Sequence, residues 1–301
     1  MKISSKQASS TRKASALKSL STLALAVMAV FCGAAPASAI PLSLGTAQQF
    51  AVLGGQTVTN TGTTTIWGDL GVYPGTSYTG SETVTQAGTV HLTDGVAHQA
   101  QLDALTAYNT LAGLPYTSDL TGQDLGAGRT LTSGVYFLSD TTAYLTGALT
   151  LDFQNNPNAL FVFQIANALT TGSSATVNVT NGSLTSDYGV YWKVGSSATL
   201  GSSTVFAGNI IADQSITLVS SAKILCGRAI ALNAAVTMDT NTISNDCLAY
   251  ANDTSDTTRS DYGSVGFSGG GGGGGTVPEP GSLALLGLGL AALGFARRRH
   301  G

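Results

Sequence analysis

The sequence predicts a mostly β chain that folds as a three-sided β-solenoid with one long α-helix packed along one side. Three observations predict it. A unit of about twenty residues recurs through the second half of the chain, each unit holds three short strand-like runs, and one segment has helical periodicity instead. Recurring units of this length that are rich in β-branched residues are typical of a solenoid, in which each coil stacks on its neighbours.

The units share a layout in which runs of Val, Ile, Leu, Phe and Thr are separated by Gly, Ser, Asn or Asp. Successive units begin at Gly134, Leu160, Gly189, Asn209 and Arg228. The segment "FAVLGGQTVTNTGTTTIWGDLG", residues 50–71, fits the same template. We therefore expect a coil near the N-terminus to belong to the same stack.

The three runs of a unit differ in their hydrophobic pattern. The first run is apolar on both faces, as in "FVFQI" and "VYWKV", so we expect it to be covered on both sides. The second and third runs alternate. In "SITLV", Ile216 and Leu218 should point into the core while Thr217 points to solvent, and "AVTMD" repeats that arrangement with Thr237 outside.

One helix is predicted over residues 93–112. Thr93 or Asp94 can cap its start, and Gly113 and Pro115 stop it. A narrow stripe of mostly small side chains recurs at helical spacing: Val96, Ala100, Ala104, Ala107 and Leu111. Such a stripe lets a helix of roughly 28 Å lie close on a flat sheet and cover about six strands. We expect it to cover the first-run side of the solenoid.

Both ends of the chain carry the features of targeting segments. Residues 1–39 combine basic residues, an apolar run and the small-residue pattern Ala37-Ser38-Ala39, which predicts a secretory signal peptide. Residues 252–276 include seven successive glycines and form a predicted linker. Residues 277–301 hold an apolar run, Ser282 to Ala296, that is short for a membrane span. The folded domain is thus expected over residues 40–251.

The predicted domain is poor in charge and offers little for catalysis or metal binding. Its four basic residues are Arg129, Lys193, Lys223 and Arg228, so a basic surface for nucleic acid is absent. Two histidines are too few to complete a metal site with its two cysteines, and no cofactor or metal is predicted. In an exported protein Cys226 and Cys247 are expected to form a disulfide.

The acidic residues are scattered, and most lie beside Gly, Asn or Thr, where Asp makes turns and local caps. Asp119, Asp124 and Asp140 could cluster, but turn roles are favoured. Solenoid hydrolases and lyases need catalytic groups that converge at one place. The chain is therefore not expected to be an enzyme.

Threonine occupies the outward positions of the alternating runs. In the second runs these residues are Thr57, Thr59, Thr146, Thr170, Thr199, Thr217 and Thr237. In the third runs they are Thr63, Thr65, Thr150, Thr176, Thr204 and Thr242, and Lys223 interrupts the series. Threonine suits β-structure in general, but that preference leaves the scarcity of charge on a wet face unexplained. A flat, uncharged array of hydroxyls and methyls suits a flat, regular target.

Several segments resemble the ice-binding domain family of bacteria and fungi: "LGTAQQFAVLGGQTVTNTGTTTIWGDLGVYPGT", "NALFVFQIANALTTGSSATVNV", "YWKVGSSATLGSSTVFAGNIIA" and "CGRAIALNAAVTMDTNTIS". The resemblance implies a discontinuous right-handed β-solenoid, with the N-terminal coil placed against later coils and a long helix alongside. It also implies adsorption to ice without a cofactor. The family's Thr-Ala/Gly-x-Thr/Asn pattern matches Thr61-Gly62-Thr63-Thr64, which adds Thr61 to the predicted site.

The C-terminal segment resembles the PEP-CTERM sorting signal, on the evidence of Pro278-Glu279-Pro280, the short apolar run, and Arg297, Arg298 and Arg299. That resemblance implies processing by an exosortase and export to the envelope surface or extracellular matrix of a Gram-negative bacterium.

Two functions are consistent with these features. The first is an antifreeze or recrystallisation-inhibiting protein that adsorbs to ice through the second-run face, centred on Thr199, Thr217 and Thr237. The alternative is a surface or matrix adhesion module that binds extracellular polysaccharide. Sugar platforms usually expose aromatic rings, and the candidates here are few: Trp67, Tyr73, Tyr78 and Tyr144.

Overall fold

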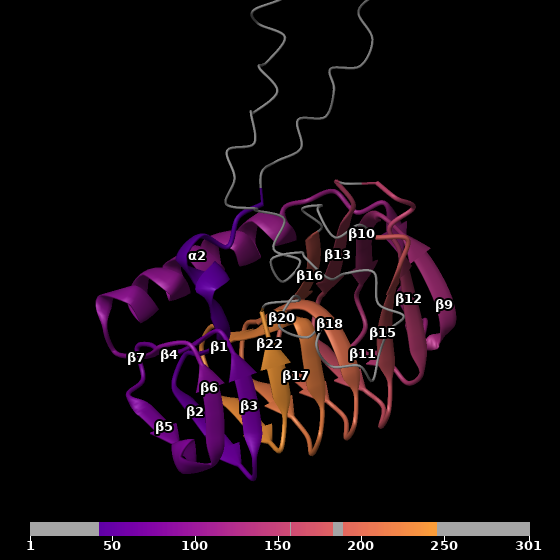
Figure 1. Cartoon of the computed structure of the whole chain (residues 1–301). Coiled ribbons are helices and arrows are strands. Elements are labelled where there is room, and N and C mark those ends of the chain that lie inside the picture. Colours follow the sequence, from indigo (N-terminus) through magenta and orange to yellow (C-terminus); the bar gives the residue numbers. More distant parts are fainter. Residues whose placement is uncertain (1–41, 157, 183–188, 246–301) are drawn as a thin grey trace, which may run out of the picture. The chain divides into compact units, whose positions relative to one another are not determined.

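A computed structural model of the chain describes residues 42–156, 158–182 and 189–245. These residues form a parallel β-solenoid with three faces and one long helix, as the sequence predicts (Figure 1). The predicted signal peptide, the C-terminal linker and the sorting segment lie outside the described residues, and the proposed domain boundaries stay predictions. Within the described part of the chain, no helix is both long and apolar enough to cross a membrane.

Face a is the side that the helix covers, and its strands pair in parallel from one end of the stack to the other. In spatial order they are β8 (Ser118–Asp119), β10 (Gly134–Leu138), β13 (Leu160–Ile165), β16 (Gly189–Val194), the second halves of β18 (Val205–Ala212) and β20 (Lys223–Ala231), β1 (Phe50–Gly54), β4 (Asp69–Val72) and β7 (Val90–Leu92).

Face b is built from the second runs and forms a separate sheet of seven parallel strands. Their spatial order is β11 (Thr142–Leu145), β14 (Ala168–Thr171), β17 (Ala198–Leu200), β19 (Ile216–Leu218), β21 (Val236–Asp239), β2 (Thr57–Thr61) and β5 (Ser77–Thr79).

Face c is built from the third runs. Its strands are β9 (Ala127–Thr132), β12 (Ala148–Asp152), β15 (Thr176–Thr180), the first halves of β18 and β20, β22 (Thr242–Ser244), β3 (Thr64–Trp67) and β6 (Val84–Ala87). β18 and β20 are long because each turns the corner from face c to face a. Gly208 makes one of these turns with φ at 100°, where a Cβ would lie 2.5 Å from Val190 Cγ1.

The stack is discontinuous in sequence. β1, β2 and β3 pair with β20, β21 and β22, so the N-terminal coils extend the stack beyond the last C-terminal coil. Figure 1 shows this junction as indigo strands beside orange ones. The fully buried Arg228 stabilises this junction, because its guanidinium donates hydrogen bonds to the Gln48 carbonyl and, at 2.8 Å, to Asn209 Oδ1. The placement implied by the family resemblance is therefore confirmed.

The interior holds two layers of apolar side chains. One lies inside the three faces and contains neighbouring aromatic rings. Between ring centroids, Trp192 stacks on Phe163 at 3.8 Å and lies tilted against Phe206 at 4.8 Å. The other lies between face a and the helix and joins Val162, Tyr191 and residues from neighbouring strands to the helix. The first runs in β1, β13, β16, β18 and β20 are thus buried on both faces, as expected, whereas β10 keeps Val135 and Phe137 partly exposed.

Helix α2 (Gly95–Ala112) runs along face a and connects β7 at one end of that face to β8 at the other (Figure 1). Asp94 caps it, since its Oδ1 accepts hydrogen bonds from the amides of Val96 and Ala97. The expected stripe is correct except at Val96, which is 39% exposed, while Ala97 is buried. Ala97 continues the alternating spacing of three and four residues that keeps a stripe on one side of a helix, and Val96 does not.

Two shorter helical turns, η1 (Gly45–Gln49) and η2 (Ser81–Thr83), complete the described elements. Cys226 is buried within β20. Its predicted partner Cys247 lies outside the described residues, so their disulfide stays a prediction.

Candidate functional site

Six threonines form a continuous row across face b. The strand register pairs Thr170 with Thr199, Thr199 with Thr217, and Thr217 with Thr237. Thr237 then pairs with Thr59, and Thr59 with Thr79. We call these six residues row b. Neighbouring parallel strands lie about 4.8 Å apart, so row b repeats at that spacing.

The local sequence explains why these threonines face outward. In β19 and β21, Ile216, Leu218, Val236 and Met238 are buried, and the threonine between each pair is partly exposed. Apolar residues on both sides of each threonine anchor the strand, because a slip by one residue would expose them. A threonine also has a stiff χ1 angle, so its methyl and hydroxyl groups hold a defined direction.

Further hydroxyls flank row b. Thr57 and Thr61 lie two residues before and after Thr59 on β2, where Thr57 pairs with Ser77 and Thr61 with Asp239. On the Thr57 side, Ser215 donates from Oγ to Ser197 Oγ at 2.9 Å. The predicted residues Thr57, Thr59, Thr61, Thr170, Thr199, Thr217 and Thr237 therefore share one face.

Face b is almost without charge. The seven strands contain no lysine or arginine, and Asp239 is their one carboxylic acid. Asp239 accepts a hydrogen bond from Thr240 Oγ1 at 3.0 Å. A face of this kind presents neither long mobile side chains nor strongly hydrated cations to what lies against it.

Thr146 does not join row b, although the sequence suggested it. The register places Tyr144 opposite Thr170, and Thr146 lies two residues further on, at the corner. There its amide donates to Asp124 Oδ1 at 3.0 Å and its hydroxyl donates to Asp124 Oδ2. Burial raises the pKa of Asp124, but the hydrogen bonds from Thr146 and Gly126 outweigh it, so the pKa lies below its usual value.

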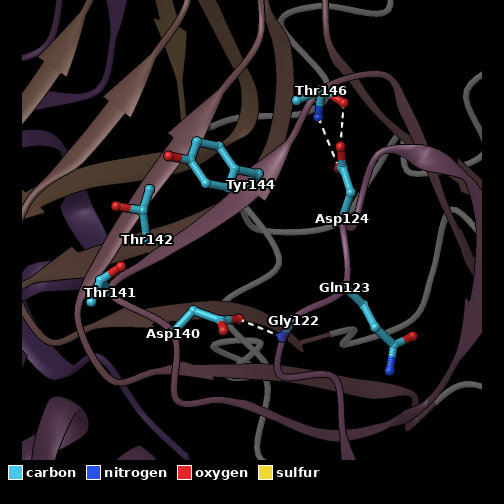
Figure 2. A pocket seen from close by; sticks show the side chains of 8 residues that line it. All are labelled: Gly122, Gln123, Asp124, Asp140, Thr141, Thr142, Tyr144 and Thr146. Carbon is cyan, nitrogen blue, oxygen red and sulfur yellow. Dashed lines mark hydrogen bonds between the residues drawn. The ribbon is translucent and has the colours of Figure 1, made fainter.

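An open pocket lies beside Tyr144 at this end of face b, with a volume of about 550 Å³. Figure 2 shows Tyr144, Thr142 and the turn from Gly122 to Asp124 around it. Asp140 accepts a hydrogen bond from the Gly122 amide at 2.8 Å, and Asp119 accepts one from the Thr121 amide. The carboxylates at this end of face b thus stabilise turns, as the sequence predicts.

Face c has a matching row that is interrupted. Its paired positions are Thr85, Thr65, Thr242, Lys223, Val205, Thr176 and Ala148, which we call row c. Of the threonines expected there, Thr204 is buried, with its Oγ1 2.7 Å from that of Thr171. Thr150 lies two residues beyond Ala148 on β12, and Thr63 lies outside the strands.

The remaining polar clusters have structural partners. His91 Nδ1 lies 2.7 Å from Asp94 Oδ2, and the ring of His98 stacks on Tyr73. Among residues 42–156, 158–182 and 189–245, no three His, Cys, Asp or Glu side chains are grouped so that they could hold a metal ion.

One member of row b, Thr79, was missed from the sequence, and Tyr144 was named there only as an exposed aromatic ring, not as the residue next to the row. Thr79 belongs to a three-residue strand, "SYT", whose alternation of hydroxyl, ring and hydroxyl is a weak signal. Tyr144 lies in line with row b and is 52% exposed. The alternation in "TAYL" predicts that Tyr144 faces outward, but the sequence alone does not predict its alignment with Thr170.

Comparison with known proteins shows which family this chain resembles. The family described as ice-binding-like matches residues 52–244, and the PEP-CTERM protein-sorting motif matches residues 276–299. An ice-binding protein of Nostoc sp. (strain HG1) is 48% identical over 279 residues, which are 92% of this chain and 94% of that protein.

Solved structures are similar as well. An ice-binding protein from the Antarctic ascomycete Antarctomyces psychrotrophicus has 37% identity and a TM-score of 0.61, over 67% of this chain and 97% of that one. An ice-binding protein from an Antarctic biological consortium has 40% identity and a TM-score of 0.64, over 70% of this chain and 94% of that one. The likeness therefore extends from the sequence to the fold.

Proposed function

We propose that this chain, which belongs to the ice-binding-like family, adsorbs to ice through face b, with Thr199, Thr217 and Thr237 at the centre of the contact. The observation that carries the proposal is the unbroken register of row b on a face without basic side chains. Thr57, Thr59 and Thr61 extend the contact on β2, and Thr170 and Thr79 lie toward its two ends.

The geometry suits a crystal surface for a physical reason. Threonines repeat at about 4.8 Å across the strands, and the flanking columns repeat at about 6.7 Å along them. Both spacings are fixed by backbone hydrogen bonds rather than by flexible side chains. The methyl groups favour removal from liquid water, while the hydroxyls can donate to and accept from ordered water molecules. The surface can thus hold a regular layer of water molecules.

The chain carries a sorting signal, and its relatives point to an exported, extracellular protein. Beyond that, we propose that an exosortase recognises Pro278-Glu279-Pro280 and the arginines at 297–299, after cleavage of the predicted signal peptide. The protein would then remain at the cell envelope or in the extracellular matrix of a Gram-negative bacterium. Ice adsorption there would be confined to the cell's surroundings.

The other functions considered have less support. The relatives named above are all ice-binding proteins, so the comparisons do not favour an adhesion module that binds polysaccharide. A non-enzymatic role is supported by the turn contacts of Asp119, Asp124 and Asp140.

The proposal is tested by measuring thermal hysteresis, the gap between the melting and freezing temperatures of an ice crystal in a solution of the purified protein. We expect a measurable gap, faceted crystals and inhibition of recrystallisation. A fluorescently labelled protein should accumulate in a growing ice hemisphere. Exclusion of folded, labelled protein from that hemisphere, together with unshaped crystals, would contradict the proposal.

A further inference from the structure

The two ends of row b differ. At the β5 end the row finishes with Thr79, whose side chain matches the rest of the row. At the β11 end the next paired position holds Tyr144 instead of a threonine. Face b therefore continues for one more strand than the threonines do.

Tyr144 differs from row b in the size of its side chain. Tyr144 is 52% exposed, and it borders the pocket at the end of the solenoid (Figure 2). The strand beneath it has the same geometry as its neighbours, since Ala143 and Leu145 are buried and all four residues of β11 pair in register with β14. The backbone at Tyr144 thus pairs as it does at the threonines of row b, and only the side chain differs.

We propose that Tyr144 sets the limit of the ice-contacting row and that its replacement by threonine lengthens the row from six threonines to seven. This inference rests on the proposed function of face b. A phenol ring reaches several ångströms further from the backbone than a threonine side chain, so it interrupts the plane in which threonine methyls meet ordered water. The ice-contacting row then extends from Thr170 to Thr79.

The expected gain can be scaled from the geometry. One strand spacing of about 4.8 Å and a two-residue repeat of about 6.7 Å add roughly 30 Å² of contact. If about half of that area is apolar, the adsorption equilibrium should rise about twofold. An effect of this size is measurable at concentrations below saturation of the ice surface.

The test compares Tyr144→Thr with the parent in the full exported chain, by thermal hysteresis over a range of concentrations. Tyr144→Val is a second variant that removes the ring, and Tyr144→Phe retains it. Tyr116→Thr is the matched control, because Tyr116 is 55% exposed and stacks on Phe137 of face a, away from row b. Thermal unfolding establishes that each variant is folded.

We expect Tyr144→Thr to require about half the parent's concentration for equal hysteresis, Tyr144→Val to gain less, and Tyr144→Phe and Tyr116→Thr to match the parent. If folded Tyr144→Thr and Tyr144→Val show no gain or a loss while the parent shapes ice, this inference is overturned and the function of face b stands. If the parent itself does not shape ice, the proposed function of face b is contradicted, and this inference with it.

Discussion

Faces b and c come from the same coils and the same alternating pattern, yet only face b presents an unbroken row of threonines. Row b holds threonine at six successive paired positions. Row c holds threonine at four positions, which Lys223, Val205 and Ala148 interrupt or end. Both faces are rich in threonine, so composition does not distinguish them, whereas register does.

The difference follows from what each face must also do. Strands of face b are short and separate, and each begins and ends at a corner. On face c, β18 and β20 run on around a corner into face a, and their residues become buried on both sides from Phe206 and Ile224 onward. On face c, β18 and β20 thus each offer a single outward position, Val205 and Lys223, and both positions break row c. A solenoid can reserve one face for a repetitive surface when another face carries the irregular connections.

The largest expected effect comes from bulk at the centre of row b. Thr217→Tyr should fold normally, because Thr217 is partly exposed with its side chain pointing outward, and surface substitutions of this kind change stability by about 0.5 kcal/mol or less. It should lower thermal hysteresis at least about tenfold, as the loss of a central contact typically does in an interface. Lys223→Tyr adds the same ring on face c and should lose little.

Equal losses from the two variants, measured on folded protein, would place face c in contact with ice as well. A loss from Lys223→Tyr alone would transfer the site to face c. Retention of activity by both would direct the search to the ends of the solenoid.

A smaller effect should follow if row c is completed. Val205→Thr with Lys223→Thr would create six successive threonines, Thr85, Thr65, Thr242, Thr at 223 and 205, and Thr176, which equals the length of row b. In the Thr217→Tyr background, this pair should restore partial ice shaping. Thermal hysteresis and crystal habit are the measurements.

The matched control is Val205→Ser with Lys223→Ser, which removes the interruption without supplying the methyl groups. We expect weaker recovery from serine than from threonine. If threonine at both positions gives no recovery while the protein folds, an unbroken register is insufficient, and some other property of face b decides between the faces.

Much of this comparison could be predicted from the sequence, because period-two alternation determines which residues of a strand face outward. Five members of row b, Thr59, Thr170, Thr199, Thr217 and Thr237, follow from alternation alone. The buried first runs and the covering helix follow from apolar residues on both sides of the strand and from helical spacing. The ice-binding family was recognisable from the same segments.

Register between strands could not be predicted in the same way. A shift by two residues leaves every side chain on its original face, so alternation cannot separate Tyr144 from Thr146, or Ala148 from Thr150. Thr204 faces inward because it lies at a corner, where its hydroxyl donates to the Gly172 carbonyl. These positions depend on backbone pairing and corner geometry, which the pattern of residue types does not contain.

The smallest expected effect on ice binding comes from face a, which the helix covers and which should take no part in the contact. Asp94 is the N-cap of that helix. Hydrogen bonds lower its pKa, and the bond from the Ala97 amide contributes most, followed by the bond from His91. A lowered folded-state pKa means that this contribution to stability is full above the unfolded pKa of about 3.9 and is lost as the pH falls through the lower, folded pKa. Asp94→Ala should therefore lower the free energy of unfolding by about 1 kcal/mol at pH 7. The difference from the parent should shrink below about pH 4.

Asp94→Asn is the matched control, since asparagine caps helices about as well as aspartate but does not titrate. It should retain most of the stability at pH 7 and lose the acid dependence at this position. Chemical denaturation at several pH values measures both effects. Near 0 °C both variants should remain folded and give the parent's thermal hysteresis, because the cap lies outside row b and row c. If folded Asp94→Ala lost ice activity, the covered side of the solenoid would contribute to the contact, and a choice between faces b and c alone would be too narrow.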